Sequence, residues 1–252
     1  MTYCVGITLN EGLIFASDSR TNAGVDNIAS FCKMRMFERV GERAIVTLTS
    51  GNLAISQGAV NLLMQYARDE NRLNLWNCRS MYDVANLVGD CLREVQRRDG
   101  PFLAEKNIDP SAWFVIGGQI AGEEPRLFMV YAEGNCIEAS RETPFFQIGE
   151  TKYGKPILDR VITPQTPMIE AAKCLMVSFD STMRSNISVG PPIDLAVIRN
   201  GELRVGLHRR FKEGDPYLQM VHQEWGEGLK RAFAQLPNLE WVDDGHPRSA
   251  AP

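Results

Sequence analysis

Histidine is scarce in this sequence of 252 residues, which has only His208, His222 and His246. A Ser-His-Asp or Cys-His mechanism therefore has few candidates for its general base. A histidine-rich zinc site is disfavoured for the same reason. We expect neither a metal nor any other cofactor.

Cysteine pairs are also missing. The six cysteines are scattered through apolar segments and form no C-x-x-C motif; they are Cys4, Cys32, Cys78, Cys91, Cys136 and Cys174. Such spacing predicts reduced, buried thiols rather than a metal knuckle or a disulfide framework.

There is no excess of positive charge, since 27 Lys and Arg face 31 Asp and Glu for a net charge of −4. This balance argues against nucleic-acid and anionic-membrane partners. We find neither a targeting segment at the N-terminus nor an apolar run near the ~20 residues that a membrane span needs. We therefore expect a cytoplasmic protein.

Glycine and proline are too few, at 21 and 13 of 252 residues, for a disordered or fibrous chain. The length favours one large domain. We predict a single domain over residues 1–237, which includes a C-terminal helix at 214–236, and a flexible tail over 238–252.

Short β-prone runs and amphipathic stretches alternate in groups. A hairpin is expected around the turn 10–12, the run Asp99-Gly100-Pro101 should end the second helix, and Asn200-Gly201 should form a tight closing hairpin. The expected strands are 3–9, 12–17, 34–40, 43–49, 113–120, 126–131, 136–139, 145–148, 193–198 and 203–207. The expected helices are 52–68, 81–97, 152–161, 167–183 and 214–236.

The order of these elements is strands, two helices, strands, two helices, strands. Grouped strands and paired helices favour α+β layering over a parallel βαβ fold. Two helix pairs covering two sheets would make a four-layer sandwich.

Thr2 stands directly after Met1. Its small side chain makes removal of the methionine expected, which would place a hydroxyl nucleophile and a free α-amino group on one residue. An α-amino group has a pKa of about 7.7 to 8, so part of it is unprotonated near neutral pH and can take the hydroxyl proton. Such a site needs no histidine.

Two further charges fall near Thr2. If the turn is centred on residue 11, the residue opposite Thr2 is near position 20, and Asp18 lies within one pleat of it. Lys33 is a charge between apolar neighbours. The alternatives are a structural ion pair between Asp18 and Arg20 and a solvated edge charge at Lys33.

Together these residues resemble a known family. Thr2, the strand end Ser17-Asp18-Ser19-Arg20, Lys33 and Thr49-Ser50-Gly51 are similar to the N-terminal threonine, Asp-x-Arg, lysine and Ser-Gly elements of proteasome β-type subunits, which are N-terminal nucleophile hydrolases. Three segments resemble more closely the bacterial proteasome homologues called Anbu. They are residues 16–26, 146–156 and 178–186, and the whole match covers about residues 2 to 210.

The resemblance implies a four-layer αββα sandwich and a homo-oligomer that forms a ring or an open helical array. It implies an N-terminal threonine hydrolase, a threonine endopeptidase-like enzyme acting on peptides or proteins. Thr2 would be the nucleophile and its own amine the general base. Asp18 would orient Lys33, which would activate the hydroxyl, and the N–H of Gly51 would bind the oxyanion. The sequence identifies no ATPase unfoldase partner.

The chain departs from proteasome β subunits at two elements. A Gly-Ser-Gly element is replaced by Gly149-Glu150-Thr151, and an Asp-x-x-Ser-Gly element by residues 180–185. Asp180 matches the aspartate of the second element, and either Ser181 or Ser185 would supply its hydroxyl. Two alternatives to a peptidase remain, a catalytically weak or inactive assembly subunit and an amide hydrolase with a non-protein substrate. Retention of Met1 would block the mechanism.

Overall fold

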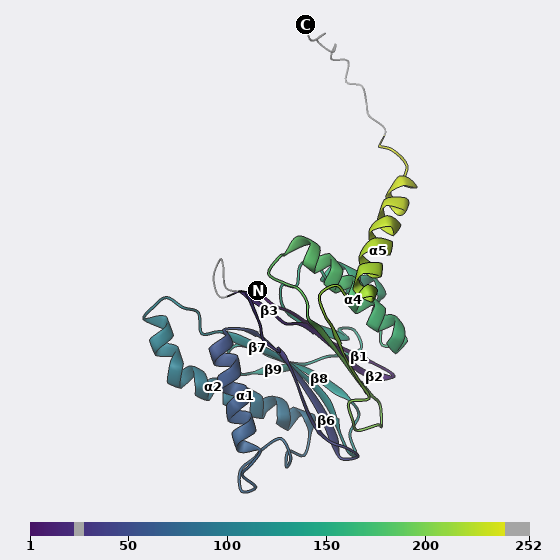
Figure 1. Cartoon of the computed structure of the whole chain (residues 1–252). Helices are drawn as coiled ribbons and strands as arrows, with labels where there is room; N and C mark the ends of the chain where they lie inside the picture. Colours follow the sequence, from purple (N-terminus) through teal and green to yellow (C-terminus); the bar gives the residue numbers. More distant parts are fainter. Residues whose placement is uncertain (23–27, 240–252) are drawn as a thin grey trace.

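The computed structural model describes residues 1–22 and 28–239 (Figure 1). Two antiparallel sheets of five strands carry the fold. One has the order β10-β1-β2-β11-β12, with bounds Phe145–Gly149, Tyr3–Leu9, Gly12–Asp18, Ile193–Arg199 and Leu207–Phe211. The other has the order β5-β6-β7-β8-β9, with bounds Met34–Arg39, Arg43–Gly51, Ala112–Ile120, Arg126–Val130 and Cys136–Glu138.

Five helices accompany the sheets within the described residues. They are α1 (Leu53–Tyr66), α2 (Met81–Ala104), α3 (Lys155–Val161), α4 (Met168–Ser185) and α5 (Pro216–Ala234). The side chain of Asn52 caps α1, and Ser80 and Asp83 form a capping box at the start of α2. A short ribbon of β3 (Arg20–Asn22) and β4 (Ile28–Ser30) extends from the end of β2.

Three apolar clusters hold these elements together. One fills the space between the two sheets and includes Phe15, Leu48 and Val115. A second lies between β6 to β8 and the pair α1 and α2, and a third lies under α3 and α4 on the outer face of the other sheet. Helices therefore cover the outer faces of two sheets that pack face to face (Figure 1).

The predicted order of strands and helix pairs is confirmed, with a few corrections at the boundaries. The helix α2 does not stop at Asp99-Gly100-Pro101 but runs to Ala104. Proline removes one backbone donor there. The next turn still closes, because Leu103 packs against the apolar cluster and the carbonyl of Pro101 accepts from the N–H of Glu105 at 3.1 Å.

The closing hairpin is also different from the prediction. The second strand, β12, begins at Leu207 instead of residue 203, and Val197 pairs with Leu207. The Asn-Gly turn itself forms, since the N–H of Glu202 donates to the carbonyl of Arg199 at 3.1 Å, but it lies within a longer loop that is tied to other parts of the fold. The N–H of Asn200 donates to the carbonyl of Glu11 at 2.9 Å, and the N–H of Gly201 donates to Oε1 of Gln119 at 2.8 Å.

The predicted tail lies outside the described residues from position 240 onward, and the domain limits stay a prediction.

All six cysteines are free thiols, as predicted. The prediction that they are all buried is wrong for two of them, because Cys32 is exposed and Cys136 is half-buried.

Within residues 1–22 and 28–239, no helix is long and apolar enough to cross a membrane.

Candidate active site

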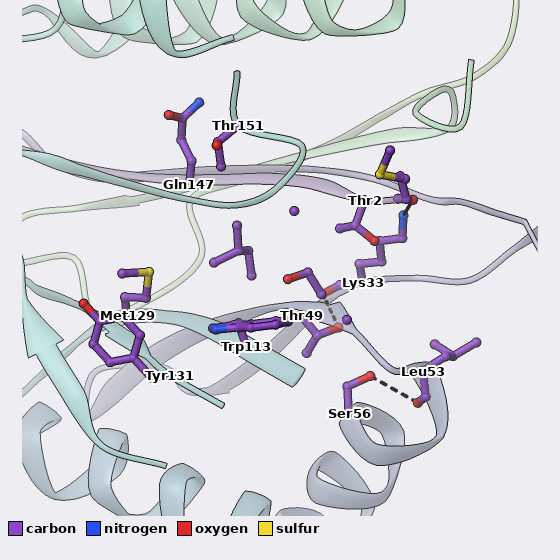
Figure 2. A pocket seen from close by; sticks show the side chains of 15 residues that line it. Thr2, Lys33, Thr49, Leu53, Ser56, Trp113, Met129, Tyr131, Gln147 and Thr151 are labelled. Atoms are coloured by element: carbon purple, nitrogen blue, oxygen red, sulfur yellow. Dashed lines mark hydrogen bonds between the residues drawn. The ribbon is translucent and has the colours of Figure 1, made fainter. Parts of the chain in front are cut away.

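A cleft of about 620 Å³ opens at the end of the fold where β1 begins and β10 ends (Figure 2). Its walls come from both sheets and from the first turn of α1. The lining residues are Met1, Thr2, Lys33, Thr49, Ser50, Gly51, Leu53, Ser56, Trp113, Met129, Tyr131, Gln147, Ile148, Gly149 and Thr151. Three of the predicted site residues, Thr2, Lys33 and Gly51, therefore share one cleft.

Thr2 is held by its backbone between two strands. Its carbonyl accepts a hydrogen bond from the N–H of Glu150 at 2.6 Å, just after β10. On the other side Cys4 pairs with Ser17, so the position opposite Thr2 is 19 instead of 20. The difference arises because the hairpin turn has two residues, since Leu9 pairs with Gly12. Asp18 still falls beside Thr2, as predicted.

Gly149 makes the close approach of β10 to Thr2 possible. Its φ angle is +88°, and a Cβ at this position would lie 2.0 Å from the carbonyl oxygen of Thr2. Only glycine adopts this conformation without strain and leaves that space open.

Lys33 and Asp18 form a buried ion pair. The Nζ of Lys33 lies 2.7 Å from Oδ1 of Asp18, and the side chains are 4% and 0% exposed. The same Nζ donates to the carbonyl of Arg20 at 2.7 Å and reaches the carbonyl of Met1 at 3.4 Å (Figure 2). The alternative of a solvated edge charge at Lys33 is therefore wrong.

Asp18 is fixed in place by a second donor, the N–H of Tyr3, at 2.9 Å. Burial raises the pKa of Asp18, and the neighbouring Lys33 opposes that rise. The alternative pairing of Asp18 with Arg20 is not found, because the Arg20 guanidinium contacts the carbonyl of Ile187 and the carboxylate of Glu213.

The N-terminal amine belongs to the same cluster of charges. Partial burial lowers the pKa of the Met1 amine from its usual 8.0, and the charge of Lys33 lowers it further, while Asp18 and Glu150 act in the opposite direction. The Met1 amine therefore loses its proton more readily than a free amine does.

Gly51 ends β6 immediately before the capping residue of α1. Its φ angle is +91°, and a Cβ there would lie 2.3 Å from the carbonyl oxygen of Ser111. The sharp change from strand to helix brings the start of α1 to the cleft, where the partial positive charge of a helix N-terminus favours an anion.

No protein-family model and no curated protein match this chain. Among solved structures, Anbu (ancestral beta-subunit) from Yersinia bercovieri is 47% identical with a TM-score of 0.90, over 96% of this chain and 100% of that one. An Anbu complex from Pseudomonas aeruginosa, described as a helical assembly, is 48% identical with a TM-score of 0.90, over 95% and 98%. This chain belongs to the Anbu family. A further member, from Hyphomicrobium sp. strain MC1, is 44% identical with a TM-score of 0.88, over 95% and 100%.

Two other predicted residues of this Anbu chain lie elsewhere. Asp180 is on α4, and its Oδ1 lies 2.7 Å from Nδ1 of His222 on α5. Ser185 is the last residue of α4. Neither residue, nor Ser181, lines the cleft that contains Thr2. The structure thus brings together Thr2, Asp18, Lys33 and Gly51 but not the residues of α4.

Glu150 is a buried carboxylate that the sequence analysis treated only as a departure from the proteasome pattern. It is 5% exposed, and its Oε2 accepts from Nδ2 of Asn186 at 3.0 Å. This bond ties the end of α4 to the turn that holds Thr2. A Glu at the first of the two departing elements, directly after a glycine in a strand end, was the available signal.

The described part of the chain contains no cluster of three or more His, Cys, Asp or Glu side chains that could hold a metal ion.

Proposed function

We propose that this Anbu-family chain is an N-terminal threonine hydrolase that cleaves peptide bonds after loss of Met1. The observation that carries the proposal is the position of Thr2 at one end of the cleft, beside the buried pair of Lys33 and Asp18. The two sheets and their outer helices are consistent with the four-layer αββα sandwich of N-terminal nucleophile hydrolases.

In the first half of the proposed reaction, Oγ of Thr2 adds to the carbonyl carbon of the scissile amide and its proton passes to the α-amine of the same residue. The charge on the former carbonyl oxygen is stabilised by the N–H of Gly51. Collapse breaks the C–N bond, the ammonium returns its proton to the leaving amine, and the acyl group stays on Oγ as an ester.

Water completes the cycle. It adds to the ester carbon while the α-amine takes one of its protons, and Oγ then leaves with that proton. The carboxylic acid product is released and Thr2 is regenerated. Throughout, the positive charge of Lys33 favours the anionic form of Oγ, and Asp18 keeps Lys33 in position.

Intact mass tests the first requirement of this function. Because Thr2 has a small side chain, we expect protein made in cells to lack Met1, and a peptide epoxyketone to add to the residue that carries both hydroxyl and amine. Fragmentation should place the adduct on Thr2. A protein that retains Met1 and takes up no probe would refute the catalytic proposal.

We also propose that the chain assembles with copies of itself, as the name of the Pseudomonas aeruginosa relative states for that protein. Only Val221 of α5 is buried, and the second half of the helix extends away from the body (Figure 1). Leu229 and Phe233 are 52% and 77% exposed at the spacing of one helix face, and Leu236, just beyond the end of α5, is 64% exposed. An apolar stripe of this kind on a projecting helix favours a protein contact.

Charge on this stripe should prevent assembly. We expect Leu229→Glu with Phe233→Glu to reduce the mass measured by light scattering from that of an oligomer to that of a monomer, since two carboxylates would be buried in the contact. The control is Gln223→Glu, which adds charge to α5 without removing an apolar side chain. A double variant that assembles as wild type would exclude α5 from the interface.

A further inference from the structure

The floor of the cleft is a continuation of the core between the sheets. Side chains of a strand alternate between its two faces. Val115 of β7 and Leu127 of β8 point into the inter-sheet cluster, so Trp113 and Met129, two residues away, lie on the same face. Tyr131 follows on that face just beyond β8.

At this end of the fold the cleft lies between the two sheets. Strand β10 of the opposite sheet contributes Gln147, Ile148 and Gly149 to the cleft, and Figure 2 shows Gln147 across it from Trp113 and Met129. Trp113 and Met129 pack against the edge of the inter-sheet cluster and are half-buried. The cleft is thus lined on its floor by apolar side chains.

These side chains stand beyond Thr2 along the cleft. Figure 2 shows Thr2 and Lys33 at one end, with Trp113 on the floor and Met129 and Tyr131 at the far end. A volume of about 620 Å³ is in the range of ligand-binding clefts and is larger than one side chain needs. When the scissile carbonyl of a substrate lies at Thr2, the adjoining side chain can therefore contact Trp113 and Met129.

Among the described residues, the lining offers no unpaired partner for a charged side chain. Lys33 is the only Lys, Arg, Asp or Glu of that described lining, and it is already paired with Asp18 at 2.7 Å. The upper wall contributes the uncharged Gln147 and Thr151 (Figure 2). A buried charge without a partner is costly, whereas an aromatic or large aliphatic side chain gains from leaving water.

We propose that the cleft selects peptides in which an aromatic or large aliphatic residue supplies the scissile carbonyl, and that Trp113, Met129 and Tyr131 make this selection. The part of this proposal that concerns cleavage rests on the function proposed above. The preference for a side chain is a property of the floor, so it can also be measured by binding alone.

The first test uses fluorogenic peptide amides that differ only in the residue before the scissile bond, with the full chain in its assembled state. We expect kcat/KM for Phe and Leu to exceed that for Arg and Glu by about tenfold or more. Replacing Trp113 with alanine should remove most of this difference, chiefly through KM. Equal kcat/KM for Phe and Arg in the wild type would overturn the proposal.

A change of specificity is the sharper test. Met129→Glu places a carboxylate on the floor and should raise kcat/KM for Arg relative to Phe by about tenfold or more. Met64→Glu is the matched control, since Met64 lies on α1, is 43% exposed and does not line the cleft. An unchanged ratio of Arg to Phe in Met129→Glu would show that the floor does not select the side chain.

A binding measurement separates this proposal from the catalytic one. In Thr2→Ala protein, peptides that end in Phe or Leu should bind about tenfold or more tightly than peptides that end in Arg or Glu, as measured by calorimetry. Such binding with no turnover by the wild type would refute the hydrolase and support the selection. Turnover by the wild type with no binding preference would refute the selection and support the hydrolase.

Discussion

Thr2→Ala should abolish peptide turnover and leave the fold intact. We expect kcat/KM to fall by at least about 10³-fold, the scale seen when the nucleophile of a hydrolase is removed. The loss should appear in kcat, since the variant lacks the Oγ that forms the acyl-enzyme. The thermal unfolding temperature should change little, because the contacts that hold this segment are made by its backbone. The carbonyl of Thr2 accepts from the N–H of Glu150, and the N–H of Tyr3 donates to Asp18.

Thr2→Ser is the matched control for this experiment. It keeps a hydroxyl and an α-amine on one residue, so measurable turnover and labelling by the epoxyketone should remain. If the alanine variant instead turned over substrate at the wild-type rate, Thr2 would not be the nucleophile, and the reaction would have to be assigned to another group of the cleft.

Lys33→Met should damage both stability and activity. The carboxylate of Asp18 is fully buried and would lose its cation, and removing one partner of a buried ion pair typically costs about 3–5 kcal/mol of unfolding free energy. Turnover should fall as well, because the positive charge that favours the anionic form of Thr2 Oγ is lost. Urea unfolding and kcat measure the two effects separately.

The stability loss of Lys33→Met should depend on pH in one direction. Burial already raises the pKa of Asp18, and removal of Lys33 would raise it further. A folded-state pKa above the unfolded-state value means that the ionised form is penalised in the fold. The deficit is therefore complete above the folded-state pKa of Asp18, shrinks as the pH falls from that pKa toward the unfolded-state value, and is absent below it.

Two variants serve as controls for Lys33. Lys33→Arg keeps the charge and should retain much of the stability, and the double change Lys33→Met with Asp18→Asn should recover stability without recovering turnover, since no buried charge is left unpaired. Unfolding of Lys33→Met at the wild-type urea concentration would mean that the pair contributes nothing to the fold.

The local parts of this fold could be predicted from sequence because their signals are local. The hairpin of β1 and β2 follows from a turn of two residues, and counting across it placed Asp18 beside Thr2 with an error of one position. The amphipathic stretches gave α1, α4 and α5 within a few residues. Pairs of residues on adjacent strands are fixed by register, which a sequence can supply.

Contacts between elements far apart in the chain could not be predicted from the sequence. The pairing of Asp180 with His222 depends on how α5 packs on α4, and no spacing in the sequence sets that contact. The bond from Asn186 to Glu150 joins the end of a helix to a strand end 36 positions away. For the same reason the apolar floor of the cleft was missed, because it depends on how the two sheets lie relative to each other at this end of the fold.

The position of the N-terminus at the cleft also has a practical side. A purification tag or fluorescent fusion placed ahead of Thr2 would be attached at the cleft, because Met1 lines the cleft and is 63% exposed. Expression vectors for an active enzyme should therefore carry their handle after the last helix, with a spacer long enough to clear the apolar stripe of α5.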